Sequence, residues 1–289
     1  MKRIFNLLML GGAIVSMSSC LKDDNANLKG GDSPAVVEWS TTAGDVPVSP
    51  ANSTYPLYVR SYPIAPSIDV PLVVNYTGTD AANDDITLTI GLNTSAIAQY
   101  NNERKTVDLE DSNLELIPSN YYTLPTTVVI PKGQHKATII VKLNSSLITN
   151  FDKKYILPVS ILSASGNTTI SKNYGTLLYQ IGAKNSYDGT YRHTYTSTLG
   201  NGTNTVRLVT TGANTVRLDP GLLGVYTNAQ TLTIDPATNL VTVSMTTLLP
   251  ITNNPASKYD PATKTFTVKY TSNGGARTFD ETYVYTGPR

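Results

Sequence analysis

The amino-acid sequence predicts an all-β fold, and two observations lead to that class. Tyrosine occurs 18 times, against 4 phenylalanines and 1 tryptophan, and threonine and asparagine recur throughout. Threonine and tyrosine fit half-buried pleated surfaces, whereas asparagine, glycine and proline favour turns. The second observation is apolar alternation in short runs, which is strict in residues 86–92 and is typical of a strand with one buried face.

The first 19 residues do not belong to this fold. Lys2 and Arg3 are followed by an uncharged apolar stretch over residues 4–15, which is too short to cross a bilayer and is typical of a secretory signal. Small residues then lead to Cys20, the only cysteine of the chain. This segment resembles a bacterial lipobox, which implies a signal peptide over residues 1–19 and acylation of the Cys20 sulfur.

Residues 20–33 are expected to form a lipidated tether. Lys22, Asp23 and Asp24 resemble the export signal that carries Bacteroidetes lipoproteins to the outer face of the outer membrane. An ordinary polar tether on the periplasmic leaflet is the alternative. The expected location is therefore the outer membrane, through the lipid anchor only, facing the cell exterior.

Charge and hydropathy exclude two classes of partner for the remaining chain. Lysine and arginine number 22 against 21 aspartates and glutamates, with no basic block, so we expect no nucleic-acid partner. No apolar run of membrane-spanning length follows the signal. The 270 residues that remain after residue 19 are enough for two domains.

The first domain is predicted to span residues 34–183. Residues 96–100, preceded by the capping run Asn93-Thr94-Ser95, predict one short helix. Pro158 predicts an edge position or a bulge, because proline cannot donate a hydrogen bond to a central ladder. The predicted strands are 36–40, 54–60, 67–76, 86–92, 126–130, 137–143, 155–161 and 175–181.

Five short motifs follow one another in this region. They are Gln99-Tyr100-Asn101, Leu116-Ile117-Pro118, Tyr121-Tyr122, Ile130-Pro131-Lys132-Gly133 and Tyr155-Ile156-Leu157-Pro158-Val159. This order resembles an N-terminal domain of unknown function in Bacteroidetes lipoproteins, which also precedes family 18 glycoside hydrolases. The resemblance implies an immunoglobulin-like β-sandwich and no particular chemistry.

A second domain is predicted over residues 186–289, after a small-residue break at 182–186. Short strands with turn signals predict a small antiparallel β-barrel or a sandwich, and the pattern leaves both open. The predicted strands are 189–196, 205–210, 214–218, 224–227, 230–234, 241–246, 265–271 and 277–285.

The second domain also carries a resemblance. Residues 187–191, YDGTY, and 259–266, YDPATKTF, resemble the companion C-terminal domain of such lipoproteins. Together the halves are similar to two-domain surface lipoproteins of polysaccharide-utilisation loci, with a role like that of SusE and SusF. The resemblance implies oligosaccharide or polysaccharide binding beside an outer-membrane TonB-dependent transporter.

Catalytic chemistry finds little support, so we expect no enzyme and no cofactor. The chain has two histidines, His135 and His193, too few for a multi-histidine metal site. Asp280 and Glu281 are adjacent in a predicted strand and point to opposite faces, whereas a glycoside hydrolase needs two facing carboxylates. No nucleophile elbow or phosphate loop is present.

Two acidic clusters lack the spacing of a calcium loop. One holds Asp80, Asp84 and Asp85, and the other Asp108, Glu110 and Asp111. We interpret both as solvated turns and expect no metal site.

Polar-tipped aromatic side chains carry the binding hypothesis, because a tyrosine can pack on a sugar and hydrogen-bond its hydroxyls. Trp39 and Tyr270 are assigned to cores. Tyr226 and Tyr259, close to turns, are expected to face solvent. The full set of glycan-binding candidates is Tyr226, Tyr259, Tyr191, His193, Tyr195, Tyr283 and Tyr285, of which the last five could instead be packing residues.

Two alternatives to glycan binding remain open. One is a structural or adhesive, pilin-like subunit that exchanges strands with its neighbours, although no basic cleavage site precedes a donor strand. The other is a protein partner of the transporter without glycan contact.

Overall fold

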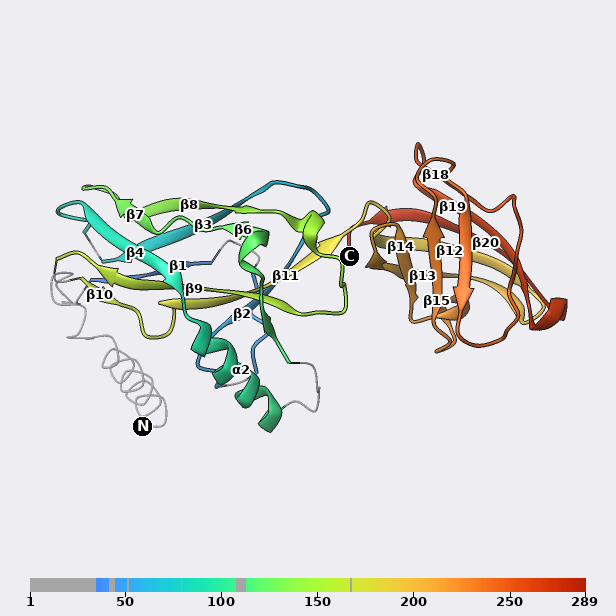
Figure 1. Cartoon of the computed structure of the whole chain (residues 1–289), viewed down its shortest axis with the longest axis horizontal. Coiled ribbons are helices and arrows are strands. Elements are labelled where there is room, and N and C mark those ends of the chain that lie inside the picture. Colours follow the sequence, from blue (N-terminus) through green and yellow to red (C-terminus); the bar gives the residue numbers. More distant parts are fainter. Residues whose placement is uncertain (1–34, 42–44, 51, 79, 108–112, 167) are drawn as a thin grey trace, which may run out of the picture.

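The structure is a computed structural model that describes residues 35–41, 45–50, 52–78, 80–107, 113–166 and 168–289. It is built from three β-sheets and confirms the predicted all-β class (Figure 1). Two sheets form a sandwich, which we define as β1 to β11, and the third forms a nearly closed barrel, which we define as β12 to β20. Cys20 and the residues 22–24 lie outside the described residues.

The first sheet of the sandwich has the strand order β10-β1-β3-β8-β6. Trp39 and Val74 point from it into the core, at positions that alternate with more exposed ones. Its strands are β1 (Val36–Ser40), β3 (Ile68–Thr77), β6 (Tyr122–Thr123), β8 (Lys136–Leu143) and β10 (Thr169–Ile170).

The second sheet has the order β2-β11-β9-β4-β7, with β5 on β9. Leu88, Ile130 and Leu177 face the first sheet across a shared apolar core. Its strands are β2 (Leu57–Pro63), β4 (Ile86–Leu92), β5 (Glu115–Leu116), β7 (Thr127–Ile130), β9 (Tyr155–Ala164) and β11 (Thr176–Lys184).

One α-helix, α2 (Thr94–Val107), packs on the second sheet. The Asn93 side chain accepts a hydrogen bond from the Ala96 nitrogen at 3.2 Å, as expected of a helix cap. Ala96 and Tyr100 form a separate apolar cluster with Ile156. The helix runs seven residues beyond the predicted end at residue 100. Short 3₁₀ turns occur at η1 (Ser119–Tyr121) and η2 (Ser145–Leu147).

The prediction that Pro158 lies at an edge or bulge is wrong. Pro158 lies in β9, between β11 and β4, and is paired with Leu178. The Leu178 nitrogen donates to Pro56 on the other side, at 3.0 Å, so this pair exchanges no hydrogen bond and the Pro158 nitrogen faces the opposite flank of β9. There the neighbour of β9 changes from β5 to β4: the Ile156 carbonyl accepts from Ile117, and the Pro158 carbonyl accepts from Asn93. No donor is therefore needed at residue 158.

The barrel consists of one nine-stranded sheet with the order β16-β15-β14-β13-β12-β20-β19-β17, with β18 on β19. Consecutive strands are mostly antiparallel neighbours. Its strands are β12 (Gly189–Ser197), β13 (Gly200–Gly212), β14 (Thr215–Asp219), β15 (Gln230–Ile234), β16 (Val241–Met245), β17 (Thr252–Asn253), β18 (Lys258–Asp260), β19 (Thr265–Ser272) and β20 (Arg277–Gly287).

A seam between β16 and the segment β17–β18 closes the barrel. The Asn253 amide accepts from the Val243 nitrogen at 2.7 Å and donates to the Val243 carbonyl at 3.1 Å, as a paired strand residue would. The Val241 nitrogen donates to the Ser257 carbonyl at 3.0 Å. The choice that the sequence left open is therefore decided in favour of a nearly closed barrel.

The strand predicted at residues 224–227 is not formed. The chain makes the 3₁₀ turn η3 (Leu222–Gly224) there, and a second one at η4 (Asn273–Gly275). Gly224 has a φ of +67°, and a Cβ at this position would lie 2.5 Å from the Val206 side chain. A left-handed, tightly packed glycine ends regular pairing, so the segment becomes a turn.

Four residues connect the end of β11 to the start of β12, and two of their side chains are fixed on the barrel. The Asn185 amide nitrogen donates to the carbonyls of Gly212 and Thr215 at 2.9 and 3.0 Å. The Asp188 carboxylate accepts from the Thr210 nitrogen at 2.9 Å. The connection is therefore anchored by side-chain to backbone hydrogen bonds.

Candidate functional site

Most of the predicted glycan-binding side chains lie in the barrel core. Tyr191, His193 and Tyr283 are fully buried, and Tyr195 and Tyr285 are partly buried. Tyr226 is 41 % exposed, as predicted. Inward-facing positions of β12 and β20 hold the buried members, which is the packing alternative that the sequence left open for them.

The prediction that Tyr259 faces solvent is wrong, since only 6 % of it is exposed. Its ring packs edge-on against Tyr187, with centroids 4.9 Å apart, and lies 4.6 Å from Phe266. The turn begins one residue later, at Asp260, whose carboxylate accepts from the Ala262 nitrogen at 2.9 Å. Strand β18 thus ends with Tyr259 inward and its neighbours outward.

A polar cluster lies inside the barrel, which we call the inner cluster and define as His193, Asn204, Tyr270, Glu281 and Tyr283. Glu281 is fully buried. Its carboxylate accepts hydrogen bonds from the Tyr270 hydroxyl at 2.8 Å and from the Tyr283 hydroxyl, and lies 3.0 Å from His193 Nε2. The His193 and Tyr283 rings are stacked, with centroids 4.2 Å apart.

The hydrogen bonds assign donor and acceptor roles within the inner cluster. The Asn204 amide nitrogen donates to the Leu223 carbonyl at 2.8 Å, which turns the Asn204 oxygen towards His193 Nδ1, 3.1 Å away. His193 Nε2 lies 3.0 Å from the Glu281 carboxylate. The two tyrosine hydroxyls are donors to Glu281, as a buried carboxylate requires.

Burial keeps the two tyrosines of the inner cluster protonated. It raises the pKa of Tyr270 and of Tyr283 well above 10, and the neighbouring Glu281 carboxylate raises both further. Their hydroxyls therefore act as hydrogen-bond donors at physiological pH. Asp280, the residue before Glu281, points to the outer face instead, so the prediction that these two carboxylates do not form a pair is confirmed.

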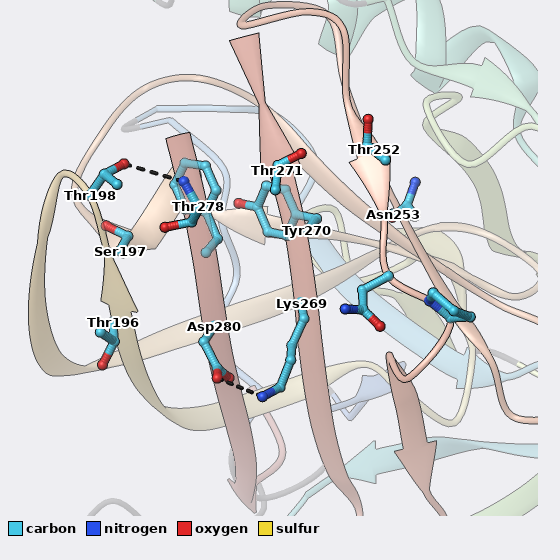
Figure 2. Close-up of a pocket in the computed structure, with 13 residues that line it drawn as sticks. Thr196, Ser197, Thr198, Thr252, Asn253, Lys269, Tyr270, Thr271, Thr278 and Asp280 are labelled. Carbon is cyan, nitrogen blue, oxygen red and sulfur yellow. Dashed lines mark hydrogen bonds and ion pairs between the residues drawn. The ribbon is translucent and has the colours of Figure 1, made fainter. Parts of the chain in front are cut away.

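A shallow hollow of about 580 Å³ lies on the outer face of the barrel, over β12, β20, β19 and β17 (Figure 2). We call it the outer hollow. Asp280 and Lys269 form an ion pair across neighbouring strands, with 2.7 Å between Nζ and Oδ2. Its remaining lining is Thr196, Ser197, Thr198, Thr252, Asn253, Asn254, Pro255, Tyr270, Thr271, Thr278 and Phe279.

The lining of the outer hollow suits a neutral ligand rich in hydroxyl groups. Its one lysine and one aspartate are paired, so the surface has no excess charge. Threonine and serine hydroxyls both donate and accept, and the methyl groups of the threonines add apolar contact. This hollow was not found in the sequence analysis, because the search there was for tyrosines. The residues that could have indicated it are the threonines at 196, 198, 271 and 278, which lie in strands or strand ends that become neighbours only in the fold.

The structure shows no metal centre among the residues that it describes, where no group of three or more histidine, cysteine, aspartate or glutamate side chains comes together. The Asp85 carboxylate accepts from the Lys132 nitrogen at 2.8 Å, and Asp84 lies 3.8 Å from the Lys132 ammonium. The cluster Asp108, Glu110 and Asp111 lies outside the described residues. No helix within the described ranges is long and apolar enough to cross a membrane.

Family models match both halves of the chain. One, a domain of unknown function (DUF7015), matches residues 189–287, which coincide with the barrel. The other is described as an N-terminal domain and matches residues 49–168 in the sandwich. No curated protein matches the chain.

Three solved structures from Bacteroides ovatus are similar over most of the chain. Two are proteins of unknown function, with TM-scores of 0.59 and 0.53 at 12% and 14% identity; they cover 88% and 86% of this chain and 95% and 93% of their own. The third is a multidomain protein including DUF1735, with a TM-score of 0.50 at 14% identity, covering 86% of this chain and 92% of its own. At such identities the likeness shows the fold alone: the chain has the β-rich architecture of these Bacteroides proteins.

Proposed function

We propose that the protein is a non-catalytic glycan-binding lipoprotein of the outer membrane, and that the outer hollow is its binding site. The observation that carries the proposal is the lining of this hollow, in which hydroxyl and amide groups lie on a mostly apolar surface around one neutralised ion pair. A sugar presents hydroxyls that donate and accept together, and such a lining satisfies both roles. An anionic ligand would need unpaired basic groups there.

The inner cluster supports the non-catalytic part of the proposal. His193 and Glu281 are the residue types of general acid–base catalysis, yet both are fully buried and neither lines the outer hollow. The three hydrogen bonds to Glu281 occupy the carboxylate. On the outer face, Asp280 is the only carboxylate that lines the hollow, whereas glycoside hydrolysis uses two.

The cellular location in this proposal rests on the sequence. Acylation of Cys20 and the acidic signal Lys22-Asp23-Asp24 would display the folded part on the cell exterior, beside a TonB-dependent transporter. We expect Cys20→Ala to abolish fatty-acid labelling and to release the protein from the membrane fraction. Replacement of residues 22–24 with alanine should reduce surface accessibility to protease and leave membrane association intact. Unchanged labelling of Cys20→Ala would contradict the anchor.

The binding proposal is tested with the soluble form that begins at Leu21. A glycan array identifies the ligand, and calorimetry gives a dissociation constant that we expect to be about micromolar to millimolar, because a shallow site buries little area. The double variant Lys269→Ala/Asp280→Ala should weaken binding at least about tenfold. The matched control removes the exposed pair Lys142 and Asp69 of the sandwich, which are 2.6 Å apart, and should bind normally.

Two outcomes contradict the proposal. An array without glycan hits would remove glycan binding and favour the adhesive or transporter-partner alternatives. Equal loss of affinity in both double variants would show that the outer hollow is not the site. Tyr226→Ala is a third comparison, because Tyr226 is the exposed tyrosine of the predicted set, and a selective loss of binding in it would relocate the site to the turn that follows η3.

A further inference from the structure

We infer that the inner cluster is the positioning element of the outer hollow, and that Tyr270 transmits its effect. This inference rests on the proposed function. The polar groups of the inner cluster would shape the hollow without contacting the ligand. The three strands β12, β19 and β20 carry both features, the cluster on their inner face and the hollow on their outer face.

The alternation of β19 and β20 places one member of the cluster directly behind a residue of the hollow, and in β12 the cluster residue lies three residues from the hollow. In β20, Glu281 points inward and Asp280 outward, and in β19, Tyr270 points inward and Lys269 outward. In β12, His193 is inward and Thr196 outward. The ion pair that neutralises the hollow therefore joins the two strands that the Tyr270–Glu281 hydrogen bond joins from within.

Glu281 has hydrogen-bond partners on three strands. His193 reaches it from β12, Tyr270 from β19 and Tyr283 from β20. Asn204 extends the network to β13 through His193. Hydrogen bonds to a buried carboxylate are stronger than those between neutral groups, so the cluster fixes the spacing and twist of these strands more firmly than backbone pairing alone.

Tyr270 is the link to the hollow because it belongs to both features. Its hydroxyl donates to Glu281, and its ring is stacked on Phe279 with centroids 4.5 Å apart and planes 6° apart. Tyr270 and Phe279 both border the outer hollow, and their buried side chains point into the barrel beneath it. Removing the hydroxyl should leave the ring in place but release the strand pair from the carboxylate, which loosens the surface that holds Lys269 and Asp280.

The test compares Tyr270→Phe with Tyr191→Phe. Each variant removes one buried hydroxyl: Tyr191 donates to the Tyr187 carbonyl at 2.8 Å and does not line the hollow. In Tyr270→Phe we expect amide hydrogen exchange in β19 and β20 to accelerate about tenfold, the equivalent of one hydrogen bond to a charged group. Affinity for the oligosaccharide from the array should fall about three- to tenfold, and Tyr191→Phe should show neither effect.

The two readouts separate this inference from the proposed function. Accelerated exchange confined to Tyr270→Phe supports the positioning role even where no oligosaccharide binds, because exchange is measured without ligand. Binding and exchange that are the same in both variants would overturn the positioning role while the proposed function stands. Glu281→Gln gives a second measurement, since it keeps the side-chain shape and replaces one acceptor with a donor. If it folds with normal exchange in β19 and β20, the inference is wrong.

Discussion

The sandwich and the barrel differ in the chemistry of their cores. The core of the sandwich between its two sheets is apolar, with Trp39, Leu88 and Val159 buried from facing sheets. The barrel places a carboxylate, an imidazole and two tyrosine hydroxyls at the centre of a comparable core. A closed sheet has only one inner face, so polar residues of distant strands meet there and can satisfy one another.

The two cores are therefore vulnerable to different substitutions. An apolar core loses stability in proportion to the side-chain volume that a substitution removes. The substitution leaves no hydrogen-bonding group without a partner. A buried polar cluster fails abruptly, because removal of one member leaves the others unpaired. The barrel should therefore tolerate fewer substitutions at inward positions than the sandwich.

Glu281→Ala should produce the largest loss. It leaves His193, Tyr270 and Tyr283 without their common hydrogen-bond partner, and we expect the free energy of unfolding of the barrel to fall by about 3–5 kcal/mol. The sandwich counterpart is Ser160→Ala, which removes a buried hydrogen bond of 2.8 Å to Thr176 and should cost about 1 kcal/mol. Denaturant unfolding measures both, and equal losses would contradict the contrast.

Alkaline pH should destabilise the barrel before the sandwich. Burial raises the pKa of Tyr191, Tyr270 and Tyr283 in the barrel and of Tyr179 in the sandwich far above 10. It raises the pKa of other tyrosines in both regions by less. Unfolded tyrosines ionise near pH 10 and these folded ones do not, so their contribution is complete below pH 10 and is lost as the pH rises above it.

One pH unit is worth about 1.4 kcal/mol for each strongly shifted group, and the barrel holds three of these against one in the sandwich, so the barrel should lose more stability than the sandwich by pH 11. Hydrogen exchange and unfolding followed from pH 9 to 11.5 check the order. Simultaneous loss of both regions, or earlier loss of the sandwich, would show that the buried tyrosines of the barrel are not decisive.

Asn253→Ala should open the seam of the barrel at a smaller cost. It removes two hydrogen bonds to the Val243 backbone, and we expect a loss of about 1–2 kcal/mol with faster amide exchange in β16. Asn254→Ala is the neighbouring control, because the Asn254 side chain accepts from the Ala256 nitrogen within a turn. Unchanged exchange in β16 would show that backbone pairing alone closes the sheet.

Removal of a surface ion pair should have the smallest effect on stability, and a similar one in both regions. Lys142→Ala in the sandwich and Lys269→Ala in the barrel each remove an exposed pair, and both should change the free energy of unfolding by less than about 1 kcal/mol. A larger loss in Lys269→Ala, measured by thermal unfolding, would mean that its effect on binding cannot be separated from an effect on folding.

Local patterns predicted the strands well and the closing contacts poorly. The strict alternation of residues 86–92 and the β-rich runs at 36–40 and 230–234 match β4, β1 and β15 at both ends. Pro158 and Tyr259 were misjudged, because the local rule for each was overridden by a change of partner strand and by ring packing.

The inner cluster could not be predicted for a different reason. His193 and Glu281 are 88 residues apart in the chain, and only the closure of the barrel brings them together. The outer hollow depends in the same way on strand order, since β12 and β19 flank β20 although β20 is the last strand. Residue types and periodicity describe one strand at a time, whereas both sites are properties of neighbouring strands.

The Asn253 seam has a consequence for self-association. An uncovered strand such as β16 would offer its backbone to a strand from another copy, which is how sheets grow into aggregates and how strand-exchanging fibres assemble. Here a side-chain amide occupies the Val243 backbone groups and caps that template within the same molecule. A donor strand would first have to displace Asn253, so the seam disfavours polymerisation of the protein through its own barrel.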